Sequence, residues 1–194
     1  MELESIIGIL LSAGQSERFG VNDKMIALYN ERPLVLHAAQ AMAALELQSL
    51  IAVTRPYLDA PSMSKLLTPV GFTAITNKAP EAGLSRSIAC AISSIMASTC
   101  QGVLICLADM PNVTTAHLAA VCKAASSARS IIASSDGNTR SPPCFIGRKH
   151  FHSLLALEGD QGARKLLRDA LVVEVEAKIL HDVDSPADLS VNFE

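Results

Sequence analysis

Two kinds of hydrophobic pattern alternate along the chain, and each predicts one kind of element. Short apolar runs bounded by turn residues predict buried strands, whereas apolar residues three or four positions apart predict helices with one buried face. The predicted strands cover residues 6–11, 50–53, 72–75, 102–107, 130–133 and 171–175. The predicted helices begin after Pro33, at Leu84, after Thr114 or Thr115, near His150 and after Gly162.

This alternation of strands and helices predicts the fold class. It is typical of an α/β protein with a mainly parallel, Rossmann-like sheet and helices on both faces. One segment differs, because Pro142 and Pro143 precede the apolar run 144–146 and cannot donate ladder hydrogen bonds. We therefore expect an antiparallel element at an edge of the sheet. The length of 194 residues suits one domain with a sizeable core, so we predict a single domain over 1–194.

Charge and cysteine content narrow the class of protein. A formal net charge of -3 and an isoelectric point near 5.9 give no overall positive field, so neither nucleic acid nor a membrane is an expected partner. Five cysteines, mostly inside apolar runs, are typical of reduced core thiols. The chain begins Met-Glu-Leu-Glu, without the basic region of a signal peptide, and no apolar run approaches the ~18 residues of a membrane helix. We expect a cytoplasmic protein.

The polar segment after the first strand is a candidate anion-binding loop. Residues 11–20 read Leu-Ser-Ala-Gly-Gln-Ser-Glu-Arg-Phe-Gly, and Lys24 follows. Ligands of open α/β sheets bind outside the carboxyl ends of the strands. Small residues let backbone amides approach an anion, while Arg18 and Lys24 add positive charge. The spacing excludes a Walker loop and a dinucleotide-binding turn, but an ordinary strand-to-helix turn remains an alternative.

A carboxylate follows the most apolar predicted strand. Asp109 stands in the run Leu-Ala-Asp-Met-Pro at 107–111. In that position it could ligate magnesium, which bridges and neutralises phosphates during phosphoryl transfer. It could equally cap a turn before Pro111. The residues alone leave both readings open.

These two motifs, with three others, resemble those of the MobA-like nucleotidyltransferases, and especially the molybdenum cofactor cytidylyltransferases. They occur in the order of that family and span nearly the whole chain. The resemblance implies the fold of the nucleotide-diphospho-sugar transferases. The five matching motifs are LSAGQSERFG with Asp23-Lys24, Gly83-Leu84-Ser85-x-Ser87, LADMP at 107–111, GDQGAR at 159–164 and DVDSPADL at 182–189.

The resemblance also implies a role for individual residues. Arg18, Lys24 and Asp109 would be catalytic, and Asp109 with Asp184 would bind Mg²⁺. Arg140 and Ser141 would contact the acceptor, although the family commonly has glycine after the arginine, which leaves the identity of the acceptor open. The residues implied to bind the nucleotide are Leu11, Ser12, Ala13, Gly14, Arg18, Lys24, Gly83, Ser85 and Ser87.

The implied reaction joins CMP to molybdopterin. The terminal phosphate of molybdopterin would attack the α-phosphorus of CTP and expel pyrophosphate, giving the cytosine dinucleotide cofactor. Because a phosphate nucleophile is already ionised, no general base is required. Related guanylyltransferases usually have two glycines where this chain has Ala13-Gly14, and methionine in place of Phe19. The Cβ of Ala13 would narrow the space beside the base, which favours a pyrimidine.

Other functions remain open at this stage. The chain could transfer GMP or use a different phosphorylated acceptor. It could also be a non-catalytic carrier or insertion factor that delivers the finished cofactor. The expected partners are CTP, molybdopterin and, transiently, a recipient molybdoenzyme.

Overall fold

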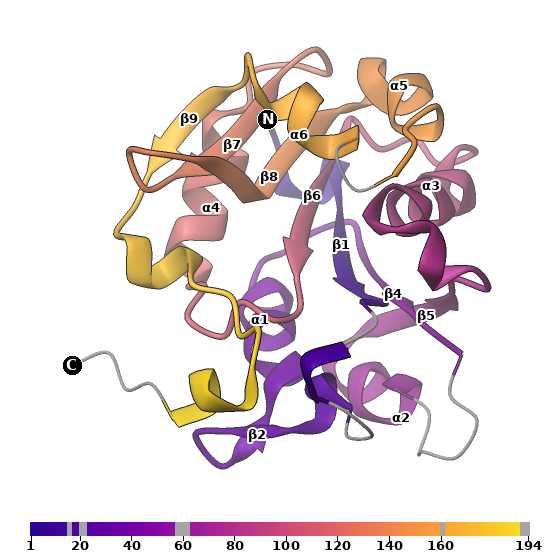
Figure 1. Ribbon diagram of the computed structural model, residues 1–194. Coiled ribbons are helices and arrows are strands. Elements are labelled where there is room, and N and C mark those ends of the chain that lie inside the picture. The colour runs from indigo at the N-terminus through magenta and orange to yellow at the C-terminus, as the bar shows by residue number, and fades with distance from the viewer. Residues whose placement is uncertain (15–16, 20–22, 57–62, 160–161, 191–194) are drawn as a thin grey trace.

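A seven-stranded sheet forms the centre of the computed structural model (Figure 1). The structure describes residues 1–14, 17–19, 23–56, 63–159 and 162–190. The strand order is β5-β4-β1-β6-β8-β7-β9, and the short strands β2 and β3 form a separate ribbon. The strands are β1 (Ile6–Ser12), β2 (Leu28–Tyr29), β3 (Arg32–Pro33), β4 (Ser49–Thr54), β5 (Phe72–Thr76), β6 (Gly102–Leu107), β7 (Ile131–Ser135), β8 (Arg140–Gly147) and β9 (Leu171–Glu174).

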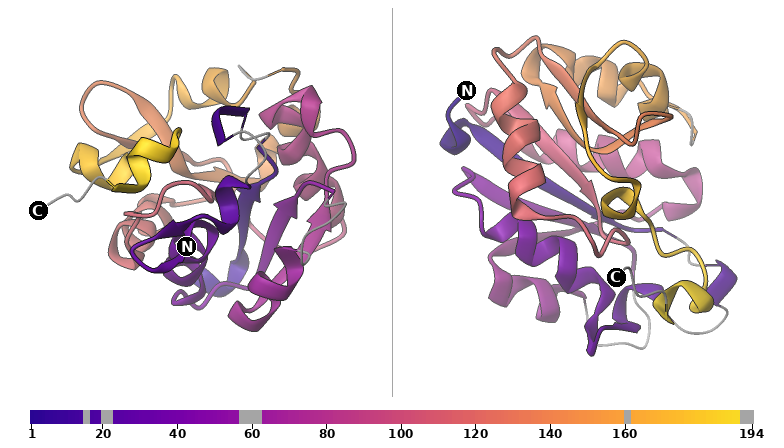
Figure 2. Two further views of the ribbon diagram at one scale, coloured as in Figure 1. Left: turned by 60° about the horizontal axis from the view of Figure 1, so that its bottom comes forward. Right: turned by 90° about the vertical axis from the view of Figure 1, so that its left-hand side faces the viewer.

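Helices cover both faces of this sheet, as the side view in Figure 2 (right) shows. Helices α1, α2 and α4 contribute to the hydrophobic cluster on one face, whereas α3, α5 and α6 contribute to the cluster on the other. The helices are α1 (Leu34–Ala43), α2 (Met63–Leu67), α3 (Leu84–Ile95), α4 (Thr115–Ala124), α5 (Phe151–Leu155) and α6 (Gly162–Leu167). The predicted α/β class, with a mainly parallel sheet and helices on both faces, is confirmed.

Strand direction determines where polar loops gather. Parallel pairing joins β1 to β4 and β6, β4 to β5, and β7 to β9. Within the seven-stranded sheet, as far as the structure describes it, β8 alone runs antiparallel to its neighbours, β6 and β7. The carboxyl ends of the other six strands and the beginning of β8 therefore meet at one edge of the sheet.

The prediction for β8 was right in direction and wrong in position. It is antiparallel, as expected, but it lies between β6 and β7 and not at an edge. The reason is that neither ladder needs a donor from Pro142 or Pro143. The ladder with β6 begins only at Cys144, and the ladder with β7 shifts register between Ala133 and Ser134 and resumes at Ser141.

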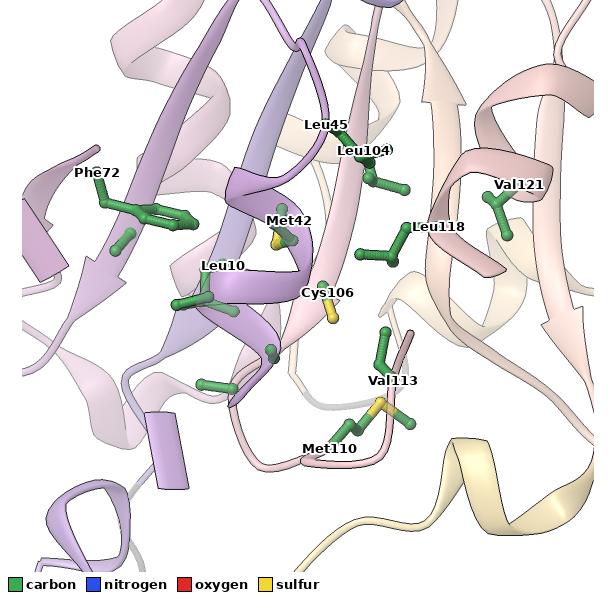
Figure 3. Packing of buried hydrophobic residues seen from close by; sticks show 14 of the residues in the cluster. Leu10, Met42, Leu45, Phe72, Leu104, Cys106, Met110, Val113, Leu118 and Val121 are labelled. Atoms are coloured by element: carbon green, nitrogen blue, oxygen red, sulfur yellow. The ribbon is translucent and has the colours of Figure 1, made fainter. Parts of the chain in front are cut away.

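The core has two layers because the central strands are buried on both faces. Along β1, Ile6 and Leu10 pack on the side of α1 and α4, whereas Ile7 and Ile9 pack on the side of α3. Figure 3 shows the first layer, in which Met42 of α1 and Leu118 of α4 lie against the sheet. This alternation in a fully buried strand explains its unbroken hydrophobic run.

The cysteines belong to this interior. All five are free thiols, and four of them are buried. Burial raises the pKa of Cys122 and of Cys144 to about 12, so both are neutral thiols. Four of the five cysteines therefore lie in the core, as predicted. In the described part of the chain, no helix is long and apolar enough to cross a bilayer.

Candidate active site

The loop after β1 starts from a rigid position. Its first residues are held from both sides, because Ser12 Oγ donates to the carbonyl of Val53 at 2.9 Å and Ala108 N donates to the carbonyl of Leu11 at 3.0 Å. Ala13 is buried, whereas Gly14 is exposed and a Cβ added there would meet no atom within 4 Å. The loop thus turns from the core into open space beside the sheet.

Arg55 joins the two ends of this loop. It follows β4 directly, donates from Nη1 to the carbonyl of Gly14 at 3.4 Å, and pairs through Nη2 with Asp23 at 3.3 Å. Asp23 also accepts from Met25 N at 3.0 Å and so caps the 3-10 helix Lys24–Ile26. The Asp23 and Arg55 side chains are only 10% and 22% exposed, so solvent screens this pair less than an exposed one.

Lys24 and Asp109 form the most buried ion pair in the described chain. Lys24 is 7% exposed, and its Nζ lies 2.7 Å from Asp109 Oδ2 and 2.8 Å from the carbonyl oxygen of Val183. Val183 N in turn donates to the backbone carbonyl of Asp109 at 2.8 Å. The loop after β1, the loop after β6 and the C-terminal segment therefore meet at Lys24.

One oxygen of Asp109, Oδ1, is buried without a hydrogen bond to any described residue. A buried carboxylate oxygen without a donor is costly, so a cation or a donor from a ligand would stabilise it.

Arg18 and Asp184 form a second ion pair with a different character. Their atoms Nη1 and Oδ2 are 3.1 Å apart, but the side chains are 72% and 55% exposed. Asp188 stabilises the turn that carries Asp184, since its Oδ2 accepts from the backbone amides of Asp184 and Ser185. These hydrogen bonds lower the pKa of Asp188.

A third carboxylate lies in the same electrostatic environment. Desolvation raises the pKa of Asp182, and the negative charges of Asp184 and Asp109 raise it further. Repulsion among neighbouring carboxylates favours an additional positive charge. The described residues contain no group of three or more His, Cys, Asp or Glu side chains that could hold a metal ion.

Several of the predicted nucleotide-binding residues line one cavity of about 440 Å³. This volume lies within the range typical of small-molecule sites. Ser12 and Ser85 are buried but do not line it, and Arg18, Lys24 and Asp184 are not among its described lining residues either. The predicted residues that line the cavity are Leu11, Ala13, Gly14, Gly83, Ser87 and Asp109.

The beginning of α3 forms another wall of this cavity. Gly83 caps α3 with φ of 86°, a backbone conformation that favours glycine. Asn77, at the end of β5, donates from Nδ2 to Ser87 Oγ at 3.1 Å and accepts from Ala79 N at 3.0 Å. Asn77 therefore holds the loop before α3 in place.

The structure separates the predicted acceptor residues from this cavity. Arg140 and Ser141 begin β8 and line a second cavity of about 830 Å³.

Sequence reasoning did not single out Arg55 or assign a binding role to Asn77. Each residue directly follows a strand, at the carboxyl edge of the sheet. That position is the feature of the sequence that could have identified them. Gln15, Ser16 and Gly20 of the first motif, and Asp160 and Gln161 of the fourth, lie outside the described residues.

The known proteins that this chain resembles include one relative and two solved structures of similar extent. The purine catabolism protein PucB of Bacillus subtilis (strain 168) is 27% identical over 198 residues, which cover 93% of this chain and 92% of PucB. The crystal structure of the Mycobacterium sp. strain JC1 homologue of Rv0371c has a TM-score of 0.74 at 21% identity, covering 96% of this chain and 94% of that one. Rv0371c of Mycobacterium tuberculosis H37Rv in complex with manganese has a TM-score of 0.66 at 19% identity, covering 94% and 95%.

The two structures agree with the observed fold along almost the full length. The model of the MobA-like NTP transferase domain matches residues 8–176, from β1 to just beyond β9. That range includes the loop after β1, the Asp109 loop and the beginning of α3. The chain therefore belongs to the MobA-like NTP transferase family, whose members are nucleotidyltransferases.

Proposed function

We propose that this protein transfers CMP from CTP to the terminal phosphate of molybdopterin, releasing pyrophosphate and giving the cytosine dinucleotide cofactor. The observation that carries the proposal is the buried pair of Lys24 and Asp109, beside a cavity bounded by a small-residue loop. Family membership supports nucleotidyl transfer. The choice of CTP and of molybdopterin rests on the resemblance of the motifs to cytidylyltransferases.

The carboxylates are suited to a divalent cation. Asp109 Oδ1 is buried without a hydrogen-bond partner among the described residues, and hard oxygen ligands are those that Mg²⁺ prefers. Mg²⁺ is usually bound by one or two carboxylates together with substrate phosphates and water, which fits a site with Asp109 and Asp184. When bound there, Mg²⁺ would neutralise the charge that develops on the phosphates.

The positively charged side chains of Arg18 and Lys24 would contact the triphosphate directly. Arg18 and Lys24 now pair with carboxylates that a divalent metal would engage. Triphosphate oxygens offer both cations new partners, and Arg18 can reach them at little cost because its present pair is exposed. Lys24 keeps its hydrogen bond to the Val183 carbonyl, which holds the ammonium group near the reacting phosphates.

The proposed reaction needs no general base. An ionised phosphate requires only alignment with the α-phosphorus and neutralisation of charge. Residues that position and neutralise are therefore sufficient for this chemistry.

The preference for cytosine would come from Ala13. It is buried and lines the cavity next to Gly14, so its Cβ occupies space that a glycine would leave to a larger base. Phe19 acts elsewhere, because it packs with Tyr29, Leu34 and Val183 in a small separate cluster.

A direct assay tests this function. The purified protein is supplied with Mg²⁺, molybdopterin and each nucleoside triphosphate in turn, and pyrophosphate release is measured. We expect release with CTP and much slower release with GTP. Faster release with GTP would instead assign guanylyl transfer, and no release with any nucleotide, together with tight binding of the cytosine dinucleotide, would identify a carrier.

A further inference from the structure

The second cavity, like the first, lies at the carboxyl edge of the sheet. Its walls come from the end of β7, the hairpin that leads into β8, strand β9, and α6 with the turn that follows it. Both cavities lie on the face of the sheet covered by α3 and α6, and these two helices contact each other. A molecule in the second cavity could therefore extend toward the nucleotide.

Three arginines line this cavity from two separate segments. Arg140 begins β8, whereas Arg164 and Arg168 lie on α6 and just after it. Glu174 is the one acidic residue among the described lining residues, so three positive charges and one negative charge leave a balance of +2. This local excess contrasts with the negative charge of the whole chain.

All three guanidinium groups are available to a ligand. Each arginine is exposed, and within the described residues none of them forms an ion pair or a side-chain hydrogen bond. Arg164 and Arg168 are four residues apart, so they project from the same side of the helical segment. Guanidinium groups bind carboxylate and phosphate through paired hydrogen bonds.

The hairpin beneath Arg140 is held in one conformation. Asp136 Oδ1 accepts from the amides of Asn138 at 2.9 Å and Thr139 at 2.8 Å. Behind it, Ser134 Oγ donates to the carbonyl of Pro143 at 2.6 Å and is 2.7 Å from His117 Nε2, with both side chains buried. Arg140 thus extends from a preorganised support, which lowers the entropic cost of binding.

We propose that Arg140, Arg164 and Arg168 bind an acidic group of the acceptor that is remote from its attacking phosphate. This inference rests on the proposed function, because the attacking phosphate must lie in the first cavity. The acceptor would therefore carry negative charge at two places, with the second provided by a phosphate, a carboxylate or another oxyanion. Glu174 would accept hydrogen bonds from N–H groups of the same molecule.

Steady-state kinetics on the intact protein tests the inference. In Arg164→Gln and Arg168→Gln we expect KM for molybdopterin to rise on the order of tenfold or more, the effect of losing a hydrogen bond to a charged group, with KM for CTP unchanged. Arg129→Gln is the matched control, since Arg129 is exposed and lines neither cavity. An unchanged KM for molybdopterin in both variants would overturn the proposal.

A second measurement separates this inference from the proposed function. Phenylglyoxal modification is followed by mass spectrometry with and without inorganic phosphate, without any turnover. We expect phosphate to slow modification of Arg140, Arg164 and Arg168 but not of Arg129. Equal protection of all four, or protection of none, would refute an anion site here even if CTP is turned over. Selective protection without pyrophosphate release would leave the anion site standing and refute the proposed reaction.

Discussion

The two cavities hold charge in opposite ways. Beside the first, three cations are paired with carboxylates: Lys24 with Asp109, Arg18 with Asp184, and Arg55 with Asp23. In the second, the arginines have no partners within the described residues.

The difference indicates two kinds of ligand. Paired charges suit a ligand that brings both signs, because a metal can take the carboxylates while phosphates take the cations. Unpaired guanidinium groups suit a simple anion. The following predictions test this contrast, beginning with the largest expected effect.

Removing the charge of Asp109 should have the greatest consequence. In Asp109→Asn we expect kcat to fall on the order of 10²–10³-fold, as when other transition-state stabilising groups are lost. The amide retains an oxygen for Lys24, so the buried ammonium keeps an acceptor and the protein should remain folded. The measurements are pyrophosphate release and Mn²⁺ titration in the presence of CTP. Wild-type turnover in a folded variant would exclude Asp109 as a metal ligand.

Arg55 should matter for the nucleotide and not for the acceptor. Arg55→Ala frees both Gly14 and Asp23, and we expect kcat/KM for CTP to fall on the order of tenfold or more through loss of alignment. Arg55→Lys keeps the charge but cannot form both contacts, so it should restore only part of the activity. An equal rise of KM for both substrates would show that Arg55 acts on the whole fold.

Replacing Ala13 should change selectivity more than rate. Ala13→Gly removes the Cβ beside the base, and we expect the ratio of kcat/KM for CTP over GTP to fall by a factor of about 10, near the effect of one methylene-sized contact. Competition between the two nucleotides measures this ratio. Arg129→Gln is again a suitable control, because Arg129 is exposed and lines neither cavity. Unchanged discrimination would assign base choice to Ser87 or to a backbone group.

The exposed pair of Arg18 and Asp184 should contribute little to stability. We expect Arg18→Gln to change the free energy of unfolding by less than ~1 kcal/mol, as is usual for exposed ion pairs, while weakening CTP binding. Urea denaturation and CTP titration measure the two effects. A large loss of stability without a change in CTP affinity would make this pair structural.

Two buried histidines, His117 and His37, predict a mild dependence of the free energy of unfolding on pH. Burial lowers the pKa of His117 and of His37 below the ordinary value of 6.5. The unfolded chain therefore binds more protons than the native one below pH ~6.5, so stability should fall as the pH drops through that value. In His117→Gln, Tm should fall less between pH 7 and 5, although His37 still contributes. An identical pH profile would mean that His117 does not titrate on unfolding.

The sequence predicted the fold well because local patterns determine it. Buried strands and amphipathic helices each have a visible period, and the N-cap expected at Thr114 or Thr115 is Thr114, which accepts from His117 N. The position of β8 could not be predicted in the same way. Whether Pro142 disrupts a ladder depends on where the neighbouring strands stop pairing, and that is a property of the folded sheet.

Only those residues of the candidate site that belong to a recognised motif could be predicted from the sequence. Motif order indicated Lys24 and Asp109, but their direct pairing and the link through Val183 depend on tertiary contacts. Arg55 and Asn77 belong to no recognised motif. Their importance follows only from their contacts with the loops around the cavity.

The reversed direction of β8 has a consequence for how specificity can change. The hairpin at 136–139 enters the carboxyl edge from strands β7 and β8, whereas the loops around the first cavity leave β1, β5 and β6. Insertions or substitutions in the hairpin can therefore reshape the second cavity without disturbing the first. The fold is modular in this sense, and under the proposed function libraries randomised at 137–141 are the direct route to variants that accept new acceptors.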